Sequence, residues 1–93
     1  MKYAFVFLLV ACASQSDQLT KYGKNVEVYG TKPTDCSVVG KLSGTNNQGS
    51  KELALNQILN QAGSINATGV FVNQEVPNGK NITIHATAYN CGG

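Results

Sequence analysis

The stretch GVFVNQEVPNGKNITIHATAYN, residues 69–90, decides the fold because it contains two strands and the turn between them. GVFVNQEV (69–76) and ITIHATAYN (82–90) are rich in β-branched and aromatic residues and are the strongest strand signals in the chain. The intervening Pro77-Asn78-Gly79-Lys80 has the composition of a tight turn. The stretch therefore predicts a β-hairpin.

One amphipathic helix is predicted before this hairpin. Ser50 is a suitable N-cap for a helix that begins at Lys51, and Asn66 is a suitable left-handed stop. Amide and hydroxyl side chains occupy the side of the helix opposite its apolar stripe. The residues that repeat at helical spacing and predict this stripe are Leu55, Ile58, Leu59, Ala62 and Ile65.

Two shorter strands are predicted nearer the N-terminus, at 25–29 (NVEVY) and 37–43 (SVVGKLS). Gly40 within the second suggests a β-bulge or the close approach of another backbone, and residues 44–49 have loop composition. The order is strand, strand, helix, strand, strand. It predicts a small α+β domain with about four strands in an antiparallel or mixed sheet, and one amphipathic helix packed on that sheet.

The chain has three cysteines, which is an odd number. In an exported protein the simplest arrangement is one pair, with the third cysteine consumed in another way. Cys36 and Cys91 flank the predicted domain and are the expected pair; the alternative is two free buried thiols. A bridge between them would close a loop of about 55 residues and stabilise the domain by about 4 kcal/mol in a chain-entropy treatment.

The N-terminus has the layout of a secretion signal. Lys2 precedes an apolar run at residues 3–11, which as a helix would span only about 14 Å of a hydrocarbon core of about 30 Å. Leu9-Val10-Ala11-Cys12 resembles a bacterial lipobox, in which the chain is cut before the cysteine and the thiol is lipidated. Ala11-Cys12-Ala13 also fits ordinary signal peptidase, which would cut after Ala13 and discard the cysteine.

The lipobox interpretation divides the chain into a lipoprotein signal peptide (1–11), a lipidated Cys12 with a flexible tether (12–24) and a single α+β domain (25–93). The expected membrane contact is through acyl chains on Cys12. Ala13, in place of Asp, favours sorting to the outer membrane, with the domain facing the periplasm. The expected partner is an unidentified envelope protein.

Composition and spacing argue against several other functions. The net charge of the 93 residues is +2, and the seven lysines are scattered without any arginine, which argues against nucleic acid. His85 is the only histidine, and no spacing joins it to a nucleophile or an orienting carboxylate, so a place on the sheet surface is expected. Neither metal-ligand clusters nor paired carboxylates are evident. We therefore expect no enzyme activity, cofactor, metal or small-molecule substrate.

The glycine-rich segment 44–49 lies between a predicted strand and a predicted helix, the context of a phosphate-binding loop. Such a loop needs Lys directly after its last Gly, followed by Ser or Thr, whereas Ser50 here precedes Lys51. The segment is therefore interpreted as a flexible loop followed by a helix N-cap.

Three segments carry a resemblance to known proteins: DCSVVGKLSG (35–44), ALNQILNQAGSINATGVFV (54–72) and ATAYNC (86–91). Together they resemble small enterobacterial-type envelope lipoproteins. One branch of that group is the outer-membrane stress-sensor lipoprotein of the Rcs phosphorelay, and another is a lipoprotein family of unknown function. The stress sensor has four disulfide-forming cysteines and a long Pro-rich linker, which this chain lacks. The second branch is the closer likeness, and it implies a fold and a disulfide but no activity.

The function expected from these features is a lipid-anchored envelope protein that acts as a non-catalytic binding or stress-sensing module through protein contacts. The alternative is a surface inhibitor or exclusion factor that blocks a foreign enzyme or receptor. Two loops are candidates for partner contact. The residues in them are Asn46, Asn47 and Gln48 in the first, and Asn78 and Lys80 in the second.

Overall fold

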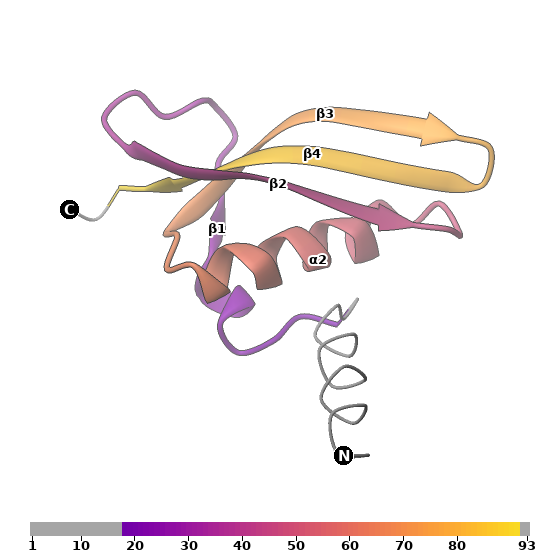
Figure 1. Ribbon diagram of the computed structural model, residues 1–93, viewed down its shortest axis with the longest axis horizontal. Coiled ribbons are helices and arrows are strands. Elements are labelled where there is room, and N and C mark those ends of the chain that lie inside the picture. Colours follow the sequence, from indigo (N-terminus) through magenta and orange to yellow (C-terminus); the bar gives the residue numbers. More distant parts are fainter. Residues whose placement is uncertain (1–17, 92–93) are drawn as a thin grey trace, which may run out of the picture.

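The computed structural model describes residues 18–91, so the predicted signal peptide and Cys12 lie outside the described part of the chain. A single sheet has the strand order β1-β3-β4-β2 (Figure 1). β1 runs parallel to β3, and the other two pairings are antiparallel, so the predicted α+β fold with a mixed sheet is confirmed. The elements are η1 (Gly23–Asn25), β1 (Glu27–Val28), β2 (Ser37–Asn46), α2 (Lys51–Ser64), β3 (Gly69–Asn78) and β4 (Asn81–Asn90).

The core lies between α2 and one face of the sheet, which we call the inner face. Figure 1 shows α2 lying along β2 and β4 on one side only. Alternate residues of β4 reach this core because side chains of a strand point to opposite faces in turn. The buried apolar residues of the core include Ala54, Ile58, Leu59 and Ala62 from α2, Val70 from β3, and Ile82, Ile84, Ala86 and Ala88 from β4.

Helix α2 begins and ends close to the predicted residues. The Ser50 hydroxyl accepts a hydrogen bond from the Leu53 N–H at 3.2 Å, and Asn66 has the left-handed conformation (φ 63°). The predicted apolar stripe needs one correction at each end. Ile65 follows the last helical residue and is 42% exposed, whereas Ala54 is fully buried. Ala54 is buried because its carbonyl lies against the β2 backbone at Gly44, where a Cβ would clash with it.

Strand β2 is longer than predicted. Residues 44–46, expected in a loop, continue the strand and pair with β4, with Gly44 opposite Ile84 and Asn46 opposite Ile82. The β-bulge suggested by Gly40 is confirmed by a shift of register between Val38 and Gly40. The predicted loop is therefore shortened to the residues between Asn46 and Lys51.

The β3–β4 hairpin is confirmed, but its turn is shorter than the predicted four residues. Pro77 and Asn78 belong to β3, and only Gly79 and Lys80 form the turn. Gly79 has φ 64° at the first central position, which suits a type II′ turn. Pro77 is tolerated because β1 pairs only with the first two residues of β3, which leaves the rest of β3 as an edge where a missing N–H is harmless.

The other edge of the sheet, β2, is hydrogen-bonded by α2. Gln57 accepts from the Thr45 N–H at 3.1 Å and donates to the Thr45 carbonyl at 2.7 Å. Gln61 donates to the Ser43 carbonyl at 2.9 Å. These amides, predicted on the polar side of the helix, thus satisfy backbone groups that an edge strand otherwise leaves open to pairing with another chain.

Residues 18–24, assigned by the sequence to the flexible tether, pack on α2. The Asn60 side chain accepts from the Thr20 N–H at 2.8 Å and donates to the Gln18 carbonyl at 2.7 Å. Leu19 packs against the core. The ordered domain therefore begins before the predicted boundary at residue 25.

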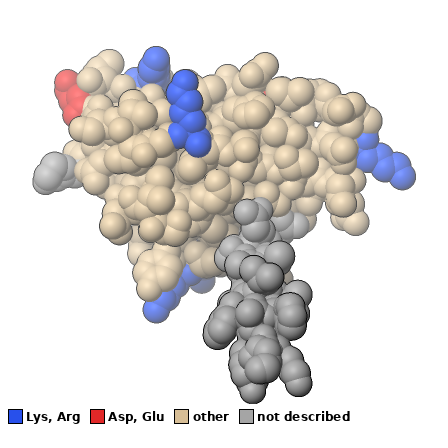
Figure 2. Space-filling model, in the orientation of Figure 1, with Lys and Arg blue, Asp and Glu red and all other residues tan. Residues whose placement is uncertain are grey.

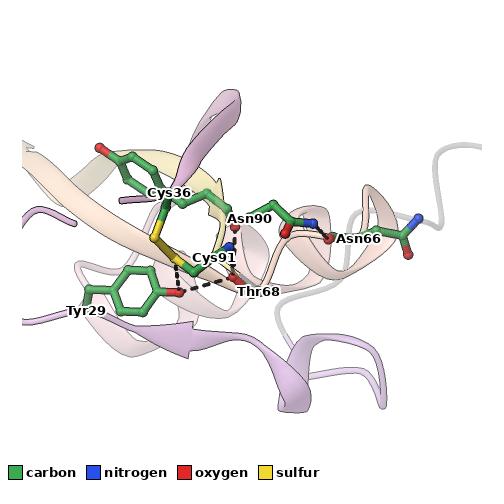
Figure 3. The surroundings of a disulfide bond; sticks show 7 residues. Tyr29, Cys36, Asn66, Thr68, Asn90 and Cys91 are labelled. Atoms are coloured by element: carbon green, nitrogen blue, oxygen red, sulfur yellow. Dashed lines mark hydrogen bonds between the residues drawn. A yellow bond between two sulfur atoms is a disulfide. The ribbon is translucent and has the colours of Figure 1, made fainter. Parts of the chain in front are cut away.

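The loop between β1 and β2 lies on the side of the sheet away from α2, which we call the outer face (Figure 1). The predicted disulfide is confirmed: Cys36, at the end of this loop, bonds to Cys91 just after β4 (Figure 3). The Tyr29 hydroxyl lies 3.0 Å from the Cys91 Sγ, and its ring lies edge-on to Tyr89 at 6.4 Å between centroids. Tyr89 is consequently only 3% exposed, although it belongs to the outer face.

Candidate functional site

Two surfaces of the domain are candidates for recognition, and the first is at the end of the sheet remote from the disulfide. The antiparallel pairing of β4 with both neighbours brings the β2–α2 loop and the β3–β4 turn to this end (Figure 1). A Cβ on Gly49 would lie 3.4 Å from the Lys80 carbonyl oxygen, so the two loops are in contact. We call this surface the distal tip; its exposed residues are Asn47, Gln48, Gly49, Asn78, Gly79 and Lys80.

Four of the five residues predicted to contact a partner lie on the distal tip, but Asn46 does not. Its side chain is 5% exposed. Its Oδ1 accepts hydrogen bonds from the Gln48 N–H at 2.9 Å and the Ser50 N–H at 3.0 Å. The prediction for Asn46 is corrected: this residue fixes the loop from beneath and is too buried to contact a partner.

Charge is sparse around the distal tip. On the face shown in Figure 2, Lys atoms lie at this end of the molecule, and Asp or Glu atoms are visible towards the opposite end. Lys51 and Glu75 form an ion pair at 3.0 Å. Because both side chains are exposed, this pair contributes at most about 1 kcal/mol to stability. The tip is therefore a mainly polar, amide-rich surface with a single unpaired cation, Lys80.

The second surface is a groove on the outer face, with a volume of about 470 Å³. We call it the outer groove. Its lining comes from the β1–β2 loop and from three strands: Lys32, Val38, Lys41, Leu42, Ser43, Asn73, His85, Ala86, Thr87 and Tyr89. This groove is not predictable from the sequence, because its lining residues are scattered over the chain and form no motif.

Thr87 and Asn73 form the most buried polar contact of the outer groove. Thr87, 6% exposed, donates from its hydroxyl to the Asn73 Oδ1 at 2.8 Å. Asn73 occupies a second bulge, where the register of β3 against β4 shifts between Val72 and Gln74. A bulge redirects the side chain at which it occurs, and bulges are frequent beside binding sites.

His85 is exposed on the outer face, as the sequence predicts for a sheet-surface histidine. Its register partners are Ser43 on β2 and Gln74 on β3. A serine nucleophile needs a hydrogen-bonded base that is itself oriented by a third group. Within residues 18–91 no hydrogen bond joins Ser43 to His85, and no carboxylate lines the outer groove.

Residues 18–91 contain no group of three His, Cys, Asp or Glu side chains placed to hold a metal ion. They also contain no helix with the length and apolar character needed to cross a bilayer. Comparison of the chain with protein-family models, curated proteins and solved structures finds no match.

Proposed function

We propose that this chain is a lipid-anchored bacterial envelope protein that acts as a non-catalytic binding or stress-sensing module. Acyl chains on Cys12 hold it in the outer membrane, facing the periplasm, and the distal tip contacts another envelope protein. The observation that carries this proposal is the meeting of two exposed loops at Gly49 and Lys80, although they are far apart in sequence.

The distal tip is held in one conformation by its own structure. Asn46 accepts two backbone hydrogen bonds from the first loop, and the second loop is a turn of two residues between paired strands. A surface that is already ordered loses little conformational entropy when a partner binds. This rigidity supports a role in recognition.

The disulfide supports location in the cell envelope. Cys36 and Cys91 are bonded, and Cys91 is exposed. Disulfides persist in oxidising compartments such as the periplasm and are rare in the cytosol. The packing of residues 18–24 on α2 also places the N-terminal end of the described chain on the α2 side of the sheet.

The anchor is tested by replacing Cys12 with Ala in the full chain and separating membrane from soluble fractions. We expect the wild-type protein in the outer-membrane fraction and Cys12→Ala in the soluble fraction. Intact-mass measurement of the wild-type protein should give a chain that begins with a triacylated or diacylated Cys12. A mature chain that begins after Ala13, or a Cys12→Ala variant that stays with the membrane, would refute the anchor.

The distal tip is tested by capturing cross-linked envelope partners with the wild-type protein and two matched double variants. Asn78→Ala/Lys80→Ala removes one amide and one cation from the tip, whereas Lys24→Ala/Asn25→Ala removes the same groups from exposed positions near η1. Truncation of a central contact costs about 2 kcal/mol or more, so the affinity of the tip variant for its partner should fall by about 30-fold, and the variant should capture correspondingly less of it. Equal capture by both variants would refute the tip as the contact surface.

A second candidate function is a surface inhibitor or exclusion factor. The observation that favours it is the end of the β3–β4 hairpin, where every residue from Asn73 to Asn81 is exposed. A rigid protruding hairpin can enter the cleft of a foreign enzyme or receptor. Capture of a resident envelope protein supports the binding module, whereas protection of cells from a foreign enzyme without a resident partner supports the inhibitor.

A further inference from the structure

The outer groove lies where the regular sheet is interrupted. Both bulges of the sheet border it, since the β2 bulge lies next to Val38 and the β3 bulge contains Asn73. The β1–β2 loop, fastened by the disulfide, contributes Lys32 to one side. The irregularities of this sheet are thus concentrated at one surface hollow, as expected where side chains are redirected towards a ligand.

The groove carries positive charge without compensation. Lys32 and Lys41 come from different segments and line the same hollow, together with the His85 ring. Neither lysine forms an ion pair with the residues between 18 and 91, where the one pair found is Lys51–Glu75. A hollow lined by charges of one sign concentrates ligands of the opposite sign.

Neutral hydrogen-bonding groups lie beside these cations. Ser43 and Thr87 supply hydroxyls, and Asn73 supplies an amide. Because the Asn73 Oδ1 accepts from Thr87, the Asn73 amide nitrogen keeps two N–H donors that make no hydrogen bond to the described residues. Val38, which is 60% exposed, adds apolar surface to the same lining. The groove therefore combines cations, uncharged donors and an apolar wall.

We propose that the outer groove binds a soluble phosphate ester of about the size of a monosaccharide. Lysine recognises phosphate as a point charge, whereas planar carboxylates are recognised best by arginine, which this chain lacks. The volume of about 470 Å³ exceeds the needs of inorganic phosphate and falls within the range of about 300–1,000 Å³ typical of small-molecule sites. The hydroxyl and amide groups suit a hydroxyl-bearing ring, and the apolar wall suits its face.

This inference goes beyond the proposed function, because it places a small-molecule ligand on a surface separate from the distal tip. It also departs from the sequence-based expectation that no small molecule is bound. The groove is open to solvent, and the ligand has few atoms. A dissociation constant on the order of 0.1–1 mM is expected from the usual affinity per atom.

The proposal is tested by nuclear magnetic resonance titration of the full isotope-labelled chain with glucose-6-phosphate, glucose and inorganic phosphate. We expect saturable shifts at Ser43, Asn73 and His85 with glucose-6-phosphate, and binding about tenfold weaker or more with each of the other two probes. Inorganic phosphate that binds as tightly as the ester would overturn the size assignment, and glucose that does so would overturn the role of charge. Shifts centred on the distal tip would overturn the location.

Two matched variants test the role of the groove cations. Lys41→Ala removes a cation from the groove, and Lys24→Ala removes one from an exposed position near η1. We expect about fivefold to tenfold weaker binding of glucose-6-phosphate for Lys41→Ala and less than about twofold for Lys24→Ala. Both lysines are exposed, so unchanged spectra outside the altered site will verify folding, and Lys32→Ala provides an independent second variant. Equal losses for Lys41→Ala and Lys24→Ala would show unspecific charge attraction and overturn the proposal.

Vesicles of phosphatidylglycerol separate a soluble ester from a lipid headgroup. We expect glucose-6-phosphate to bind Cys12→Ala and the wild-type protein alike, and vesicles added to Cys12→Ala, which has no acyl chains to insert, to leave its groove resonances unchanged. Groove resonances that respond to vesicles but not to glucose-6-phosphate would overturn the soluble ligand. Because the groove titration does not depend on Cys12, its result is independent of whether the anchor is real.

Discussion

The two faces of β4 show how one strand can serve two purposes. Its inner-face residues Ile82 and Ile84 are buried under α2, whereas Thr83 and His85 between and beside them lie on the outer face with polar neighbours. The alternation of side chains along a strand makes this separation possible at every second residue. The core is thus built on the inner face, whereas the outer face carries the groove in which we propose a ligand, so substitutions on the outer face should leave the core intact.

The outer face is covered only at one end, and it is covered by a loop and not by a helix. The inner face is covered by a helix through apolar packing. Over Tyr89, the outer face is covered by the β1–β2 loop, which is held by the disulfide and by the contacts of Tyr29. The inner face is thus covered through apolar packing, and one end of the outer face is covered by a loop held by a disulfide. Three changes measure how much such contacts contribute to stability.

Removal of the disulfide should have the largest effect on the free energy of unfolding. In Cys36→Ala/Cys91→Ala the unfolded chain regains the freedom of a loop of 55 residues, and a loss of about 4 kcal/mol is expected in the free energy of unfolding. Urea denaturation measures this loss. The wild-type protein under reducing conditions should behave in the same way, and a midpoint that does not change on reduction would show that the bridge does not contribute.

Truncation of a core residue should have the next largest effect. Ile84→Ala leaves a cavity under α2 and should cost about 3 kcal/mol. His85→Ala is the matched control on the opposite face of the same strand and should change the free energy of unfolding by less than about 0.5 kcal/mol. Thermal and urea denaturation of the two variants measure this difference. Similar losses at both positions would contradict the conclusion that the core depends on the inner face of β4 and not on the outer face.

Removal of an edge amide should have the smallest effect. Gln57→Ala removes two hydrogen bonds to Thr45, and a loss of about 1 kcal/mol is expected because both bonds are exposed to water. Gln57→Glu keeps an acceptor for the Thr45 N–H but removes the donor, so it should retain part of the stability. Hydrogen exchange at the Thr45 amide should accelerate in Gln57→Ala, and protection equal to the wild type would show that the edge contact is dispensable.

The sequence predicted those parts of the fold that depend on local patterns. β-Branched and aromatic residues on either side of a turn-forming segment indicated the hairpin, spacing of three and four indicated α2, and the odd number of cysteines led to the Cys36–Cys91 pair. The end of β2 was missed because residues 44–46 have the composition of a loop. They form a strand because β4 is long enough to offer them partners at Ile82 and Ile84, a reason that lies elsewhere in the chain.

The candidate surfaces were predictable only in part. Composition identified both loops of the distal tip, but their contact depends on the pairing of three strands. Asn46 was misassigned because an exposed loop asparagine and a buried one that accepts backbone hydrogen bonds look alike in sequence. The outer groove was not predicted because a bulge at Asn73 changes which side chains share a face. No local sequence pattern indicates that bulge.

The packing of residues 18–24 on α2 has a consequence for how fully a partner is bound, if Cys12 is the anchor that we propose. Only residues 13–17 separate Cys12 from this packed segment, and five residues span at most about 18 Å. A domain held so close to a surface has an effective concentration, towards a partner in the same membrane, in the millimolar range. If Cys12 is the anchor that we propose, a contact at the distal tip that is too weak to detect in dilute solution would be nearly saturated at the membrane.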